Sequence, residues 1–320
     1  MIAVRAERGL TLIELLIAMT IGIIITGTIA QALALSSAHF RRSQALAQMQ
    51  EQADVALQFL AEDIRHAGHW GLAGDAALVA GRSISGDDNP LTLQQPARCS
   101  AQFALNLAHP VEVAADTARW ACGLAPDTGN DSLVVRYAST DTVAAQPHRL
   151  QVIASPNASR VIDNGDYPLT GPPLTELLNL HVRGYYIAPR SSLFPEQPVL
   201  RRLTLSALST RPTFIDEEIS AGVERLVLRA AVDSTGDGFA DLTLSANDPR
   251  LAQFDANGAP LMPVLGIHVT MVNRSADTHW RTPAPQQLSL AGRAWMAPAD
   301  GRLRFVSEQF IPVHNAMRAL

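Results

Sequence analysis

The chain has 320 residues, of which 47% are hydrophobic and 17% charged, a composition typical of a globular protein with one large or two modest domains. Its net charge of −5 excludes an overall basic field of the kind that attracts nucleic acid, and its aromatic content of 5% is low for base stacking. All 25 basic residues are arginine, which excludes chemistry that depends on a P-loop lysine or a Schiff-base lysine.

The first predicted element is a long apolar helix. Residues 10–35 are mostly apolar or small, about 26 in all, and a helix needs roughly 20 to cross the hydrocarbon core of a bilayer. A cleaved secretory signal peptide is the alternative, with Arg5 and Arg8 as its basic start and "ALA" at residues 32–34 as its cleavage site. The run is longer than the apolar segment of most signal peptides, and it contains a carboxylate at Glu14. A membrane-spanning helix is therefore favoured.

The stretch "RGLTLIELLIAMTIG", residues 8–22, resembles the processing site of type IV pilins and type II secretion pseudopilins. In that family a prepilin peptidase cuts after a glycine on the cytoplasmic side, the new N-terminal residue is methylated, and the fifth mature residue is glutamate. Those positions fall on Gly9, Leu10 and Glu14, although Leu10 departs from the usual phenylalanine. The resemblance implies a leader at residues 1–9 and an assembly role for Glu14, whose carboxylate pairs with the freed amine of a neighbouring subunit. A glutamate that only reaches the lipid headgroups is the alternative.

Small residues recur at every fourth position of the apolar segment. They are Ala18, Gly22, Thr26, Ala30 and Ala34, and together they make a smooth helix face that allows another helix to approach closely. We predict that this face packs against neighbouring subunits. The alternative is chance spacing in an alanine-rich chain.

Residues 10–68 are predicted to form one helix, with 10–35 in the membrane or filament core and 38–67 amphipathic. Apolar residues recur every three to four positions in the second part and predict one buried stripe, made of Leu46, Met49, Ala53, Ala56, Leu57, Leu60, Ile64 and Ala67. Gly68 is predicted as a left-handed C-cap. The helix end, "DIRHAG" at residues 63–68, resembles that of PilW-type minor pilins.

The remainder, residues 69–320, is predicted to be a β-rich globular body. Strand-like runs separated by turns occur at 132–138, 149–154, 178–188, 199–207, 224–232, 264–273 and 302–313. Several of them alternate apolar and polar residues, which predicts an antiparallel sheet covered on one face by the amphipathic half of the helix. The expected fold is therefore α+β and pilin-like. Residues 72–130 show few clear strands and are expected to form an elaborate loop region.

The two cysteines, Cys99 and Cys122, lie in this loop region. If the body is periplasmic, a disulfide between them would close a loop of about 24 residues and stabilise a segment with little secondary structure. Two separate buried thiols are the alternative.

The stretch "DSTGDGFADL", residues 233–242, is the candidate metal site. Asp233, Thr235, Asp237 and Asp241 stand at positions 1, 3, 5 and 9 of a calcium-binding loop. The bidentate glutamate expected at position 12 is replaced by Leu244. The alternative is a hairpin in which the aspartates and glycines only form the turn.

No motif for catalysis is found, so we predict that the chain is not an enzyme. By resemblance it is a minor pilin of a type IV pilus, with prepilin peptidase, other minor pilins, the major pilin and the inner-membrane assembly platform as partners. The N-terminus would be cytoplasmic, with the body periplasmic and then extracellular in the pilus. Such proteins support pilus biogenesis, twitching motility, adhesion or DNA uptake. A type II secretion pseudopilin and a calcium-dependent tip adhesin are the alternatives.

Overall fold

A computed structural model describes residues 11–82, 99, 101–115, 120, 122, 125–157, 159–165, 174–207, 211–255, 258–278, 285 and 287–316. The chain divides into two compact units, Met1–Gln48 and Met49–Leu320, which are described separately. The first unit contains the N-terminal part of a single long helix, and the second contains the end of that helix and all the strands.

The helix, α1, runs from Leu12 to His66, close to the predicted span. It is followed by Gly68, whose φ of +75° is the left-handed conformation predicted for a C-cap. The Gly68 N–H turns away from the helix and donates to the carbonyl of Arg136 at 3.1 Å. The end of the helix is thereby tied to the body.

The second half of α1 buries the predicted stripe. Six of its members are fully buried, namely Met49, Ala53, Ala56, Leu60, Ile64 and Ala67. Leu46 and Leu57 are half-buried, at the margin of the stripe. The stripe also holds a charged residue that the apolar periodicity does not predict, Asp63, which is 1% exposed.

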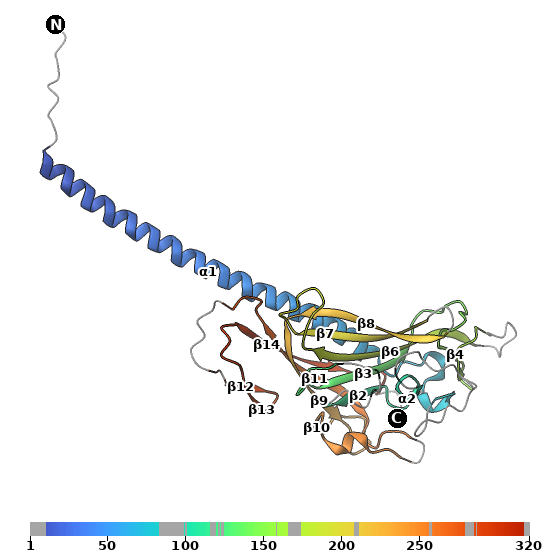
Figure 1. The fold of residues 1–320 in the computed structure, drawn as a ribbon. Coiled ribbons are helices and arrows are strands. Elements are labelled where there is room, and N and C mark those ends of the chain that lie inside the picture. Colours follow the sequence, from blue (N-terminus) through green and yellow to red (C-terminus); the bar gives the residue numbers. More distant parts are fainter. Residues whose placement is uncertain are drawn as a thin grey trace, which may run out of the picture. The chain divides into compact units, whose positions relative to one another are not determined.

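The strands of the body form three sheets, and Figure 1 shows their arrangement within it. An eight-stranded sheet has the order β1-β5-β4-β6-β3-β2, with β7 paired to β6 and β8 paired to β7. A four-stranded sheet has the order β10-β9-β11-β14, and β12 and β13 form a hairpin. The strands are β1 (Val79–Ala80), β2 (Val111–Ala114), β3 (Ser132–Ala138), β4 (Gln151–Ala154), β5 (Ser159–Ile162), β6 (Glu176–Ala188), β7 (Val199–Ala207), β8 (Pro212–Ala221), β9 (Val223–Val232), β10 (Leu242–Ser245), β11 (Val264–Arg274), β12 (Gln287–Leu290), β13 (Arg293–Met296) and β14 (Arg304–Pro312).

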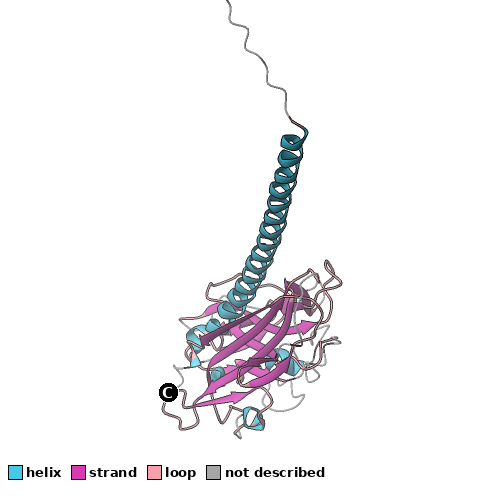
Figure 2. Cartoon of the chain, turned by 90° about the vertical axis from the view of Figure 1, so that its left-hand side faces the viewer, coloured by secondary structure: helices cyan, strands magenta, loops and turns pink. Residues whose placement is uncertain are grey.

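Every described pairing is antiparallel apart from β1 with β5, so the predicted α+β fold is confirmed. Figure 2 shows the long antiparallel strands lying side by side. All seven predicted strands are present, with shifts of no more than two residues at most ends. Strands β1, β2, β5, β8, β10, β12 and β13 were not predicted.

The eight-stranded sheet is buried on both faces. On one face, Leu133 and Tyr185 pack in a core with Leu60 of α1 and Leu228 of the four-stranded sheet. On the other face, Val134, Val182 and Tyr186 pack in a second core with side chains of residues 70–122. The prediction of one covered face is therefore incomplete, because the expected loop region forms a second cover.

This second cover contains short helices η1 (Gly71–Ala73), η2 (Ala76–Leu78) and α2 (Ala101–Leu105). Trp70, Phe103 and Trp120 supply its large buried side chains. Gly184 in β6 makes room for them, since a Cβ at this position would lie 3.1 Å from the Trp120 ring and 3.2 Å from the Phe103 ring. The predicted disulfide between Cys99 and Cys122 is present and packs against the same core.

Candidate assembly segment and the polar contacts of the body

The start of α1 is a capping box built from Thr11 and Glu14. The Thr11 N–H and hydroxyl donate to Glu14 Oε2 at 3.1 and 2.9 Å, and the Glu14 N–H donates to Thr11 Oγ1 at 3.4 Å. This reciprocal pairing satisfies backbone donors that a helix start otherwise leaves free. Gly9 and Leu10, the predicted processing residues, lie outside the described residues.

The rest of the apolar half is not covered by any of the residues that the structure describes. Every residue from 11 to 44 is exposed, and the most apolar window of α1 has a mean hydropathy of 2.2. By length and composition alone, this segment of α1 can cross a membrane. The predicted small-residue face is also uncovered, and a Cβ added at Gly22 would meet nothing within 4 Å. Packing of Ala18, Gly22, Thr26 and Ala30 against other helices stays a prediction.

Hydroxyl groups in the apolar half bond to their own helix. Thr20 Oγ1 donates to the Ile17 carbonyl at 2.8 Å, and Thr26 Oγ1 donates to the Gly22 carbonyl at 2.7 Å. Thr28 and Ser37 make the equivalent bonds at 2.8 Å. A polar group satisfied in this way is tolerated in an apolar environment, where water is not available as a partner. These threonines are therefore compatible with a membrane or a filament core.

Asp63, near the end of α1, is bound by side chains of the eight-stranded sheet. Tyr137 Oη donates to Asp63 Oδ1 at 2.7 Å, and Tyr185 Oη donates to Oδ2. Arg183 Nε lies 3.4 Å from Oδ1, and Arg202 Nη1 lies 3.9 Å from Oδ2. Burial, together with the neighbouring Asp63 carboxylate, raises the pKa of both tyrosines, so their hydroxyls stay protonated and act as donors. This cluster fixes the rotation of the helix end against the sheet.

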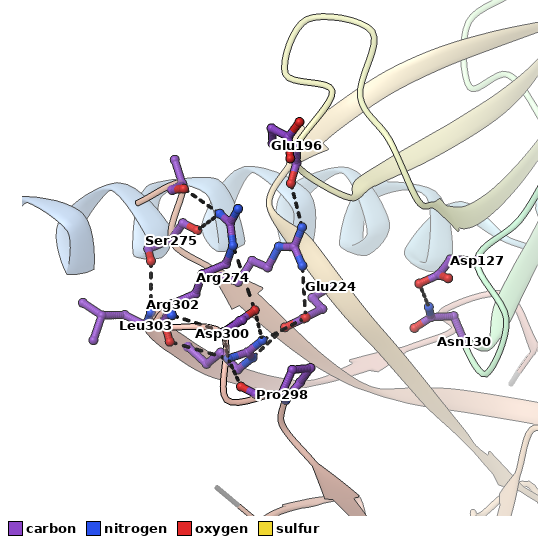
Figure 3. Close-up of polar contacts among 12 residues, drawn as sticks. Asp127, Asn130, Glu196, Glu224, Arg274, Ser275, Pro298, Asp300, Arg302 and Leu303 are labelled. Carbon is purple, nitrogen blue, oxygen red and sulfur yellow. Dashed lines mark hydrogen bonds and ion pairs between the residues drawn. The ribbon is translucent and has the colours of Figure 1, made fainter. Parts of the chain in front are cut away.

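A second charge cluster joins the strands of the four-stranded sheet (Figure 3). Glu224 at the start of β9 accepts bonds from Arg304 Nε at 2.7 Å and from Arg274 Nη1 at 3.3 Å. Asp300 accepts from Arg304 Nη2 at 2.9 Å. The Arg304 guanidinium also lies 5.7 Å from the centre of the Trp295 ring. The charges of this cluster are thus paired within the body.

The predicted calcium loop connects β9 and β10. Asp233 is 3% exposed, and its carboxylate accepts loop N–H bonds of 2.6 to 3.4 Å from Thr235, Gly236, Asp237 and Gly238. Asp241 accepts from the N–H and hydroxyl of Ser234 at 3.0 and 2.9 Å. Among the residues that the structure describes, no group of three or more His, Cys, Asp or Glu is placed to hold a metal. Calcium binding by Asp233, Thr235, Asp237 and Asp241 stays a prediction of the sequence.

Comparison with known proteins bears on the N-terminal segment. Residues 4–30 match the family model of the prokaryotic N-terminal methylation motif. No curated protein matches the sequence significantly. A solved type IV-like pilin from Thermus thermophilus is similar at 13% identity, over 84% of this chain and 98% of that one, with a TM-score of 0.36. A TM-score of this size does not support an argument about fold.

The motif match covers Gly9, Leu10 and Glu14 together with most of the exposed apolar half of α1. The N-terminal segment therefore carries a prokaryotic N-terminal methylation motif.

Proposed function

We propose that this chain is a PilW-type minor pilin of a type IV pilus. It is inserted in the inner membrane with its N-terminus in the cytoplasm and is cut after Gly9. It then joins other minor pilins and the major pilin through the apolar half of α1. The observation that carries the proposal is an exposed apolar helix that contains Glu14 within a methylation motif at residues 4–30.

The size of the body supports a role for this chain in a priming or tip complex rather than as a repeating subunit of the shaft. The described part of Met49–Leu320 contains three sheets, two large hydrophobic cores and two small ones. A shaft subunit has to repeat its packing along the whole filament, which limits the size of the part that surrounds the core. A bulky body is more easily accommodated at the end of the filament, where it has neighbours on one side only.

Replacing Glu14 tests the assembly role. In Glu14→Ala, we expect cleavage after Gly9 to continue, since that bond lies outside the replaced side chain. We expect incorporation into sheared pili to fall at least about tenfold, because the neighbouring amine loses its partner in an apolar core. Glu51→Ala, which removes an exposed carboxylate further along α1, is the matched control and should incorporate normally. Unchanged incorporation of Glu14→Ala, or loss of its cleavage, would contradict the pairing role.

A further inference from the structure

Strand β2 is one edge of the eight-stranded sheet. It pairs with β3 alone among the described strands. The Arg136 N–H donates to the Pro110 carbonyl at 2.8 Å, so residues 110, 112 and 114 direct their backbone groups toward β3. Val111 and Val113 therefore direct their N–H and C=O groups toward the open edge. No hydrogen bond to these groups is found among the described residues, although Val111 is 6% and Val113 7% exposed.

Backbone groups that no described residue pairs are hydrogen-bonding positions for another chain. An extended chain placed beside β2 would supply the missing partners. Addition of a strand to a free sheet edge is a recurring mode of peptide recognition, in which backbone bonds give affinity and side-chain pockets give specificity.

The open edge of β2 lies along a cleft of about 800 Å³. One wall is the whole of β2 with its flanking residues, 110–115. Much of the remainder comes from residues 246–249, 259–260 and 262–264. Aromatic and apolar side chains dominate the lining, including Trp70, Phe103, Phe254 and Met262. This volume falls within the roughly 300–1,000 Å³ of ligand-binding clefts, and apolar walls with a few polar groups are typical of them. The lining can therefore hold the apolar side chains of an added strand.

More acidic than basic side chains line the cleft, so its net charge is negative. Asp75, Glu112 and Asp248 line it, whereas its arginine, Arg136, is fully buried and pairs with Glu112 at 3.1 Å. Asp248 pairs with Arg250, but no arginine pairs with Asp75 among the described contacts. Burial, and then the charge of Arg136, lower the pKa of His109 to about 4, so this lining residue is neutral at pH 7. A basic side chain beside the added strand would complement this charge.

We propose that the cleft beside β2 binds an extended peptide segment of a partner protein, which pairs with Val111 and Val113 and alternates apolar with basic residues. This binding site goes beyond the pilin role and does not depend on it, because the cleft lies within the body and the assembly segment lies in the apolar half of α1. A negative result for the peptide site would therefore not contradict the pilin role, and a negative result for the pilin role would not contradict the peptide site.

A direct test measures peptide binding to the full chain in non-ionic detergent by fluorescence anisotropy. The probe is a labelled seven-residue peptide that alternates valine and arginine, and its matched control alternates valine and glutamate. We expect saturable binding of the basic peptide and at least tenfold weaker binding of the acidic one. Equal affinity for both peptides, or no saturable binding of the basic one, would overturn the proposal.

Backbone methylation of the peptide tests strand pairing itself. All N–H groups of alternate residues in a strand point the same way, so methylating the valine amides blocks one edge and methylating the arginine amides blocks the other. We expect one methylated peptide to bind like the parent and the other to lose binding. Retention or loss of binding by both would rule out addition to an edge.

Asp75→Asn locates the site on the chain. Asp75 accepts the Ala77 N–H at 2.8 Å, and asparagine keeps this bond while removing the charge. We expect affinity for the basic peptide to fall about threefold, as is typical of an exposed charge pair. Asp54→Asn, which neutralises an exposed carboxylate on α1, should leave affinity unchanged. An equal change in affinity for the two variants would show that the peptide does not bind beside Asp75.

Discussion

Residues 12–48 and the body Met49–Leu320 differ in where their side chains find partners. In the first region every residue from 12 to 44 is exposed, and no described part of the chain covers its continuous apolar surface. In the second region two cores enclose the eight-stranded sheet, and charged clusters such as Glu224 with Arg274 and Arg304 are paired internally. We infer from this contrast that the side chains of residues 12–48 make their contacts with other molecules, whereas the body is stabilised mainly by contacts within the chain.

Two carboxylates of the same helix illustrate this contrast. Glu14 bonds to Thr11 alone among the described residues and is exposed. Asp63 is 1% exposed and is surrounded by two tyrosines and two arginines. Both are acidic residues in apolar parts of α1, but only Asp63 is bound by side chains of the body.

The largest expected effect comes from Asp63→Ala. It removes the acceptor of two tyrosine hydroxyls and the carboxylate that lies beside Arg183, and we expect the free energy of unfolding of the body to fall by about 3–5 kcal/mol. Denaturant titration of the full chain in detergent, followed by tryptophan fluorescence, measures this change. Asp54→Ala, an exposed site on the same helix, should change it by less than about 0.5 kcal/mol. A loss below about 1 kcal/mol for Asp63→Ala would show that the cluster does not hold the helix end.

Acidification should weaken the body through His109, which is buried, and His181, which is half-buried. Burial lowers the pKa of His109 and of His181 to about 4, with Arg136 and Arg183 as the next causes. In the unfolded chain each titrates near 6.5, so the unfolded state binds more protons between pH 6.5 and pH 4. Stability is therefore expected to fall as the pH drops through this window, by roughly 1–3 kcal/mol for each histidine.

Thermal unfolding at pH 7.0 and pH 4.5 measures this effect. The variants His109→Gln and His181→Gln separate the histidines from carboxylates that titrate in the same window, and each should show a smaller fall in Tm than the parent. An equal fall in parent and variants would assign the pH dependence to other groups.

The smallest expected effect is that of calcium on the body. The Asp233 carboxylate is already bound by four loop N–H groups, so hydrogen bonds within the loop hold its conformation. We expect the Tm of the full chain to be the same in calcium as in chelator. A saturable rise in Tm that is lost in Asp237→Asn would instead establish the calcium site predicted from the sequence.

Elements with a periodic pattern of apolar residues could be predicted from the sequence. The buried stripe of α1 and long strands such as β3 and β7 follow from apolar spacing, and the C-cap follows from Gly68. Strand β8 was missed because it begins at Pro212 and carries three acidic residues. In the structure Arg201 of β7 pairs with Asp216 and Glu218, and Arg202 pairs with Glu217. A cross-strand pairing of this kind cannot be seen in one strand alone.

The contacts that define the body's sites were less predictable. Asp63 matches the helix-end motif, but its burial depends on Tyr137 and Tyr185, which are more than 70 positions away in sequence. Strand β2 has only four residues in a region that was expected to be loops, so its free edge and the cleft beside it had no sequence signal. The roles of Gly9, Leu10 and Glu14 stay predictions, which the sequence allows because the processing motif has a fixed local spacing.

The central claim is that the apolar half of α1 begins at a processed N-terminus and serves assembly. Mass spectrometry of the N-terminal peptide of the mature full-length protein, purified from membranes, tests it most directly. We expect a mature chain that begins at Leu10 with a methylated α-amine. A chain that begins at Leu35 would show removal of the segment as a signal peptide and would contradict the claim.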